Sequence, residues 1–95
     1  MMTSKERAKL RGLAASIQSI FQVGKNGSGE TFLKQIDEAL EARELIKITI
    51  LNNSGEDARE LAEEFAKETN SEVVTVIGSK VVLYRKSIKN HKIDL

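Results

Sequence analysis

The chain of 95 residues contains no cysteine and no proline, and its only aromatic residues are three Phe and one Tyr. The absence of cysteine excludes disulfides, thiolate metal sites and cysteine nucleophiles, and is compatible with a reducing cytoplasm. Aliphatic runs such as Val73 to Ile77 are far shorter than a membrane span. We therefore expect a single soluble, cytoplasmic domain that does not associate with membranes.

The residues needed for common kinds of catalysis are also scarce. The single histidine, His91, has no candidate partner near it in sequence, whereas metal and catalytic sites usually cluster their ligands. Gly24-Lys25 lacks the upstream glycine of a nucleotide-binding P-loop, and Gly27-Ser28-Gly29 lacks the third small residue of the dinucleotide fingerprint. The sequence predicts a protein that is not an enzyme, with no cofactor and no metal.

Charge is segregated along the chain, although the net charge is only +1. Residues 1–27 carry a net charge of +4, residues 28–79 a net charge of −7, and residues 80–95 a net charge of +4. Such asymmetry indicates a charged partner better than the total does. If the basic ends meet in space, they form one cationic face; alternatively, the charges only solvate unrelated surfaces.

Hydrophobic periodicity predicts an α/β (α+β) fold with the order α-β-α-β-α-β-β. Strands that flank a helix should pair in parallel, and the last two strands should form an antiparallel hairpin, giving a mixed four-stranded sheet with three helices. The expected helices begin at the capping box Thr3-Ser4-Lys5-Glu6, after the glycine-rich loop, and at Ser54; the expected strands are 20–23, 45–51, 73–77 and 81–84.

Three further expectations concern burial and domain limits. We expect strand 73–77 to be nearly fully buried and the second helix to present a solvated acidic face. We expect one domain over residues 1–86 and a basic flexible tail over residues 87–95. The acidic face comprises Asp37, Glu38, Glu41 and Glu44.

The stretch from Gln22 to Thr31 joins an apolar run to an amphipathic helix through three glycines. Within it, Gly24-Lys25-Asn26-Gly27 is a Gly-x-x-Gly loop with a basic and an amide side chain. Glycine lets the backbone lie close to a ligand, and a following helix N-terminus favours anions. In RNA-binding modules of the KH type such a loop clamps backbone nucleotides. Alternatively, Asn-Gly forms an ordinary hairpin turn, although the helical spacing from Phe32 onwards argues against this.

The chain contains five sequence blocks in this order: Arg11-Gly12-Leu13-Ala14, Gln22-Val23-Gly24-Lys25-Asn26-Gly27, Ile36-Asp37-Glu38-Ala39-Leu40, Glu44-Leu45-Ile46-Lys47, and Val76-Ile77-Gly78 followed by Leu83-Tyr84-Arg85. Together these blocks resemble the YhbY family of bacterial proteins, the stand-alone form of the CRM (chloroplast RNA splicing and ribosome maturation) domain. The resemblance covers about residues 3–86 and implies an RNA-binding domain folded like the C-terminal domain of translation initiation factor three. It also implies association with precursors of the large ribosomal subunit.

The function expected from these features is non-enzymatic binding of ribosomal RNA by a monomer in large-subunit (pre-50S) assembly. Carried across by position, the family's loop is Gly24, Lys25, Asn26 and Gly27, and its basic first helix supplies Lys5, Arg7, Lys9 and Arg11; the basic C-terminal segment adds Lys80 and Arg85. The aromatics fall on predicted core faces, so base stacking is not the main contribution. The alternative is a protein-interaction module that docks on a ribosomal or assembly protein through its acidic face or a strand edge.

Overall fold

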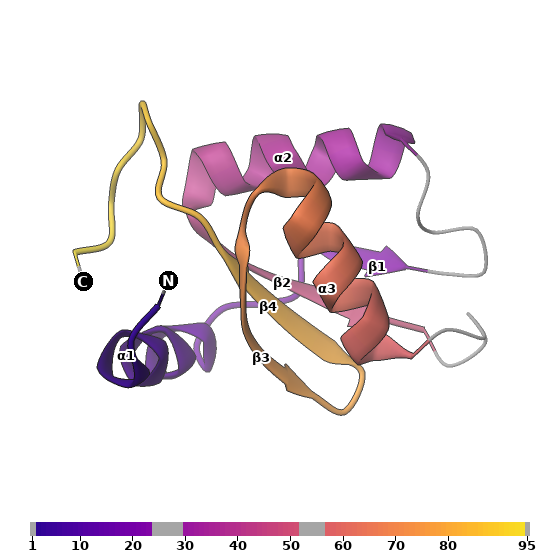
Figure 1. Ribbon diagram of the computed structural model, residues 1–95, viewed down its shortest axis with the longest axis horizontal. Helices are drawn as coiled ribbons and strands as arrows, with labels where there is room; N and C mark the ends of the chain where they lie inside the picture. The colour runs from indigo at the N-terminus through magenta and orange to yellow at the C-terminus, as the bar shows by residue number, and fades with distance from the viewer. Residues whose placement is uncertain (1, 24–29, 52–56, 95) are drawn as a thin grey trace.

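The computed structural model describes residues 2–23, 30–51 and 57–94. The loop residues Gly24 to Gly27 therefore lie outside the described part of the chain. The described elements follow the predicted order (Figure 1). They are α1 (Ser4–Ala14), β1 (Phe21–Val23), α2 (Glu30–Arg43), β2 (Leu45–Ile50), α3 (Ala58–Thr69), β3 (Glu72–Ile77) and β4 (Lys80–Tyr84).

The four described strands form one mixed sheet in the order β1-β2-β4-β3. The predicted parallel pair β1–β2 and the predicted hairpin β3–β4 are both present. The hairpin folds back so that β4, and not β3, pairs with β2. As a result, β2 and β3 run in the same direction with β4 antiparallel between them.

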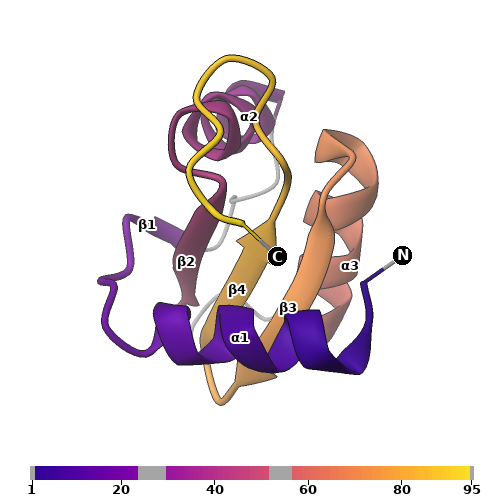
Figure 2. The ribbon, with the colours of Figure 1, turned by 90° about the vertical axis from the view of Figure 1, so that its left-hand side faces the viewer.

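The sheet is covered by helices on both faces, each with its own apolar core. On one face α2 and α3 pack against the sheet through Ile36, Leu40 and Phe65. On the other face α1 lies across β2, β4 and β3 (Figure 2), and Leu10 and Ala14 pack against the strands there. This second core is smaller, and α1 covers only the part of the face where β2 begins and β4 ends.

We call the two ends of the sheet the tail end and the loop end. The tail end is where Leu45 begins β2 beside Tyr84, the last residue of β4. The loop end is where β1 and β2 finish, at Val23 and Ile50, and where Lys80 begins β4. In Figure 1, α1 and the C-terminal segment after β4 lie away from the arrowhead of β1.

The burial of the last hairpin differs from the sequence prediction. Strand β3 was expected to be nearly fully buried, but only Val74 is buried in it and Ile77 is 67% exposed. The reason is position, because β3 is an edge strand while β4 is enclosed by two neighbours. Four of the five residues of β4 are buried.

The helix starts also test the sequence analysis. Thr3 caps α1, and the reciprocal hydrogen bonds with Glu6 confirm the predicted capping box. The third helix begins later than expected, because Asp57 is its N-cap and accepts a hydrogen bond from the Arg59 N–H at 2.8 Å. Ser54, the expected start, lies outside the described residues.

Candidate functional site

The basic residues of α1 lie on two flanks of the helix, as predicted, but they do not act together. The guanidinium of Arg7 is half-buried and donates from Nη1 to the carbonyl oxygens of Val73 and Val74, the second at 2.8 Å. On the other flank, Lys9 donates to the carbonyl of Asp94. Both side chains thus join α1 to other parts of the protein, while Lys5 and Arg11 are exposed.

Arg85 is used in a similar way at the tail end of the sheet. Its side chain is 19% exposed and pairs with Asp37 on α2. It also donates to the carbonyl of Thr69 at 2.7 Å and to the carbonyl of Asp37 at 2.9 Å. Arg85 therefore ties α2 and the end of α3 to the end of β4, and its predicted role in RNA binding stays a prediction.

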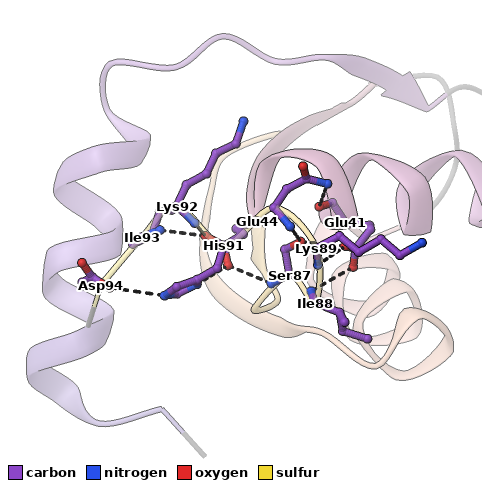
Figure 3. Close-up of polar contacts among 10 residues, drawn as sticks. Glu41, Glu44, Ser87, Ile88, Lys89, His91, Lys92, Ile93 and Asp94 are labelled. Atoms are coloured by element: carbon purple, nitrogen blue, oxygen red, sulfur yellow. Dashed lines mark hydrogen bonds and ion pairs between the residues drawn. The ribbon is translucent and has the colours of Figure 1, made fainter.

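The C-terminal residues 87–94 wrap around a buried carboxylate, that of Glu44 (Figure 3). Glu44 accepts hydrogen bonds from the backbone N–H groups of Ser87, Lys92 and Ile93 at 2.6–2.7 Å. Nδ1 of His91 lies 2.8 Å from the same carboxylate. At Glu44 these four contacts differ from the expected solvated acidic face, because the segment supplies donors that the buried carboxylate needs. Asp37 and Glu38 are exposed as expected, and the flexibility of the tail stays a prediction.

Glu41, one turn earlier on α2, binds the same segment from a more exposed position. Its carboxylate accepts from the Ser87 hydroxyl at 2.7 Å and from the Lys89 N–H at 2.9 Å. The side chain of Ile93 packs against the smaller core beneath α1, which contains Leu10 and Tyr84. The tail is thereby fastened to α2 by hydrogen bonds and to α1 by apolar contact.

The electrostatics of this cluster agree with its geometry. Burial alone would raise the pKa of Glu44, but the hydrogen bonds from Ser87, His91, Lys92 and Ile93 outweigh it and lower the pKa to about 2. The hydrogen bond to Glu44 raises the pKa of His91 above its ordinary value. Glu44 also has a positive φ of 66°, a conformation that is costly for a residue with a side chain. The carboxylate contacts give a physical reason for a glutamate at this helix end.

The other end of the sheet carries a polar surface that α1 leaves uncovered. In the pairing register Gln22 is opposite Thr49, Thr49 is opposite Lys80, and Lys80 is opposite Ile77. Paired residues point to the same side of a sheet, so these four side chains form a row across all four described strands. Lys80 Nζ donates to the Thr49 hydroxyl at 2.8 Å. We call this row, together with Lys47 and Thr75 beside it, the open sheet face.

A shallow hollow of about 220 Å³ lies between the open sheet face and α1. Arg11, Lys47 and Lys80 line it, and no carboxylate is among the described residues that line it. Arg11 and Lys80 were predicted as contacts from the sequence, whereas Lys47 was not. The alternation of Lys47 with buried isoleucines was a usable signal, because it places this lysine on the face opposite the larger core.

The predicted Gly-x-x-Gly loop follows directly from this surface in the chain. Gln22 is part of the open sheet face, Val23 ends β1, and the described chain resumes at Glu30, the first residue of α2. The open sheet face and the residue that leads into the loop are thus at the same end of the sheet. The basic residues of the tail are connected to the opposite end, after Tyr84.

The described residues offer neither a metal site nor a membrane-spanning helix. They contain no group of three or more His, Cys, Asp or Glu side chains arranged to hold a metal ion. In the same ranges, none of the helices combines the length and the apolar character needed to cross a bilayer.

Comparison with known proteins places this geometry in context. Residues 2–85 match the model of the CRS1/YhbY (CRM) domain. The chain is 46% identical over 95 residues to "Probable RNA-binding protein YqeI" of Bacillus subtilis, covering 100% of this chain and 99% of that protein. It is 33% identical over 86 residues to a Haemophilus influenzae protein named "RNA-binding protein", covering 90% and 87%. Over 100% of the chain and 99% of the neighbour, it superposes with a TM-score of 0.83 and 50% identity on the solution structure of a Staphylococcus aureus protein whose description also refers to RNA binding.

Proposed function

Because this chain belongs to the CRS1/YhbY (CRM) domain family, we propose that it is a non-enzymatic, cytoplasmic RNA-binding protein that acts as a monomer on ribosomal RNA in large-subunit precursors. RNA is the ligand named for several of its relatives. The role in ribosome assembly is the part of the proposal that rests on the family resemblance alone.

The observation that carries the proposal is the grouping of Arg11, Lys47 and Lys80 around one hollow at the loop end of the sheet. Cations from α1, β2 and β4, which are far apart in sequence, converge there without a lining carboxylate among the described residues. Phosphate contacts by Lys and Arg supply most of the sequence-independent affinity for nucleic acid. A surface of this kind suits a polyanion better than a neutral ligand.

The loop Gly24 to Gly27 is the second part of the proposed interface. It follows β1 at the same end of the sheet, and its lysine and backbone amides would hold phosphates, with Asn26 adding a polar contact. Together, the loop and the open sheet face would contact about five phosphates. At roughly −0.7 per contact for single strands, the slope of log affinity against log salt should then be near −3.5.

The test measures binding of a labelled single-stranded RNA by fluorescence anisotropy across a salt series. Lys47→Ala and Lys80→Ala should each weaken binding and flatten the salt slope by roughly 0.7, the loss of one phosphate contact. Arg11→Ala should also weaken binding, because it removes a third cation from the hollow. Lys67→Ala is the matched control, because Lys67 is exposed on α3, in the layer that covers the opposite face of the sheet. Equal effects from all four variants would reject the open sheet face as the interface.

The assembly role needs a separate experiment in cells. Crosslinking followed by sequencing of the attached RNA should recover segments of large-subunit ribosomal RNA, and the protein should sediment with precursor particles. Recovery of unrelated RNAs without enrichment for ribosomal segments would reject this part of the proposal and leave RNA binding itself in place.

A second candidate, docking on a ribosomal or assembly protein, is favoured by the acidic outer surface of α3. Glu60, Glu63, Glu64 and Glu68 are all exposed there, on the layer opposite the open sheet face. RNase treatment of precursor particles separates the two functions. Release of the protein by RNase supports the RNA interface, and retention supports protein docking through α3.

A further inference from the structure

The hollow beside the open sheet face is lined by apolar as well as cationic side chains. The apolar part of its lining comes from Ala14 at the end of α1, the C-cap residue Ala15, Val82 of β4 and Ile77 of β3, and Thr75 adds one hydroxyl. Ile77 is one of three large hydrophobic side chains that are exposed among the described residues. The other two, Leu13 and Ile88, are not part of this lining.

The charges around Ile77 limit what could cover it. Arg11, Lys47 and Lys80 line the same hollow from three different elements, so an occupant has to combine an apolar body with negative charge at more than one point. A second neutral hydrophobic surface would bring three cations out of water without a partner, which is costly. A nucleotide within a single strand has the required composition, because a flat base lies between two phosphates.

The types of side chain present also fit an unpaired base. The guanidinium of arginine is planar and stacks on bases, which an ammonium cannot do. Arg11 is exposed and reaches the hollow from α1, while Ile77 lines it from the edge strand β3. The two therefore approach the same space from different elements.

We propose that an unpaired RNA base inserts into this hollow between the Arg11 guanidinium and the Ile77 side chain, with the neighbouring phosphates on Lys47 and Lys80. This inference deepens the proposed function and rests on it, because it names the part of the nucleotide that each residue recognises. Contact with the base is apolar and planar, and Thr75 supplies the one neutral hydrogen-bonding side chain in the lining. Discrimination between bases is accordingly weak.

The experiment compares two labelled oligonucleotides of equal length and charge, one with uracil at every position and one that is abasic throughout. Ile77→Ser should weaken binding of the uracil oligomer about fivefold, the order of magnitude expected for loss of one apolar contact. Its salt slope should stay unchanged, since no phosphate contact is lost. Binding of the abasic oligomer should not change.

Two further variants sharpen the test. Arg11→Lys retains the charge but not the plane, so it should weaken binding of the uracil oligomer and retain the salt slope. It also serves as the independent test if Ile77→Ser does not fold. Ile88→Ser is the matched control, because Ile88 is 91% exposed in the tail, and it should bind both oligomers like the unaltered protein.

The outcomes separate this inference from the function on which it rests. If the unaltered protein binds neither oligomer, RNA binding itself is rejected and the base pocket with it. If Lys80→Ala weakens binding while Ile77→Ser and Arg11→Lys do not, the RNA interface stands and the base pocket is rejected. If polyglutamate displaces RNA as effectively as an oligonucleotide of equal charge does, an acidic peptide is the better occupant and the base pocket is likewise rejected.

Discussion

The tail end and the loop end of the sheet use the same kinds of charged residue in different ways. At the tail end, Arg7, Lys9 and Arg85 donate to carbonyl groups or to a carboxylate of the protein itself. At the loop end, Lys80 donates to a neutral hydroxyl and lines a hollow with Arg11 and Lys47. Basic residues at the first end are therefore expected to support folding, and those at the second end to support binding.

Two carboxylates near the C-terminal end of α2 make the contrast sharper. Glu44 and Glu41 hold the C-terminal segment by side-chain contacts, and Glu44 is fully buried. Their donors are backbone N–H groups, a hydroxyl and the His91 ring, and not the ammonium groups of the neighbouring lysines. The lysine charges of this segment are thus not what attaches it.

The largest expected effect follows from removing the buried charge at the tail end. Glu44→Gln should destabilise the protein by about 2–3 kcal/mol, because a neutral amide is a weaker acceptor and brings a donor into a buried site. The melting temperature should fall by about 10–20 °C for a domain of this size. Glu38→Gln, on the exposed side of α2, is the control and should stay within about 0.5 kcal/mol.

Hydrogen exchange should show which contacts account for the loss of stability in Glu44→Gln. In Glu44→Gln, the amides of Ser87, Lys92 and Ile93 should lose protection, since the carboxylate is their acceptor. Unchanged protection of these three amides would contradict the attachment of the tail through Glu44.

A smaller effect is expected at Arg7. Arg7→Ala should destabilise the protein by about 1–2 kcal/mol, because it removes a charged donor from two carbonyl groups of the edge strand. Its affinity for single-stranded RNA should change less than that of Arg11→Ala. Chemical denaturation and fluorescence anisotropy on the same two proteins check both statements. If Arg11→Ala were the less stable protein and Arg7→Ala the weaker RNA binder, Arg11 would be the structural residue and Arg7 the binding residue.

The expected effect at the loop is smaller again and concerns binding alone. Lys25→Ala should weaken binding to all single-stranded RNAs by about 1 kcal/mol and reduce the salt slope, as loss of a phosphate contact does. Lys89→Ala, in the tail segment, should leave the slope unchanged. If Lys25→Ala retains the full slope, the loop does not contact phosphate.

The smallest effect is the alkaline decline in stability that the His91–Glu44 pair should cause. The raised pKa of His91 means that its contribution is fully present below about pH 6.5 and is lost as the pH rises through the folded value. The lowered pKa of Glu44 means that its contribution is present above about pH 4.5 and is lost as the pH falls towards about 2. Stability of the unaltered protein should therefore decline on both sides of this range.

The alkaline decline can be assigned with one variant. Denaturation of His91→Asn across the same pH range should lack the alkaline decline and keep the acidic one. The magnitude on the alkaline side should be modest, because the His91 side chain is 39% exposed and water screens the pair. An alkaline decline of equal size in His91→Asn would show that another group is responsible.

Most of the fold was predictable because its signals are local. A few neighbouring residues are enough to define each signal. Examples are the helical spacing of Leu10 and Ala14, the Thr3–Glu6 capping box and the alternation of apolar and polar residues in β2. The strand order was not predictable, because nothing within the last hairpin specifies which of its strands joins β2. Hence β3 was expected to be buried, although it lies at the edge.

The candidate site was predictable in part. Arg11 and Lys80 were predicted from charge segregation, and the structure brings them together. The same argument also selected Arg7 and Arg85, whose guanidinium groups the structure places on acceptors of the protein. Charge alone does not separate a residue that binds a partner from one that holds the fold, since both are cations in polar segments.

The sequence by itself determined the element order, the family, and the likeness to RNA-binding relatives, because these depend on residue types at short and regular spacings. Only the tertiary structure decided which partner each charged side chain contacts. Glu44 and Lys92 are 48 positions apart, and Arg7 and Val74 are 67 apart. Such contacts form when helices and strands pack, and short-range patterns carry no information about the partner that packing brings to each side chain.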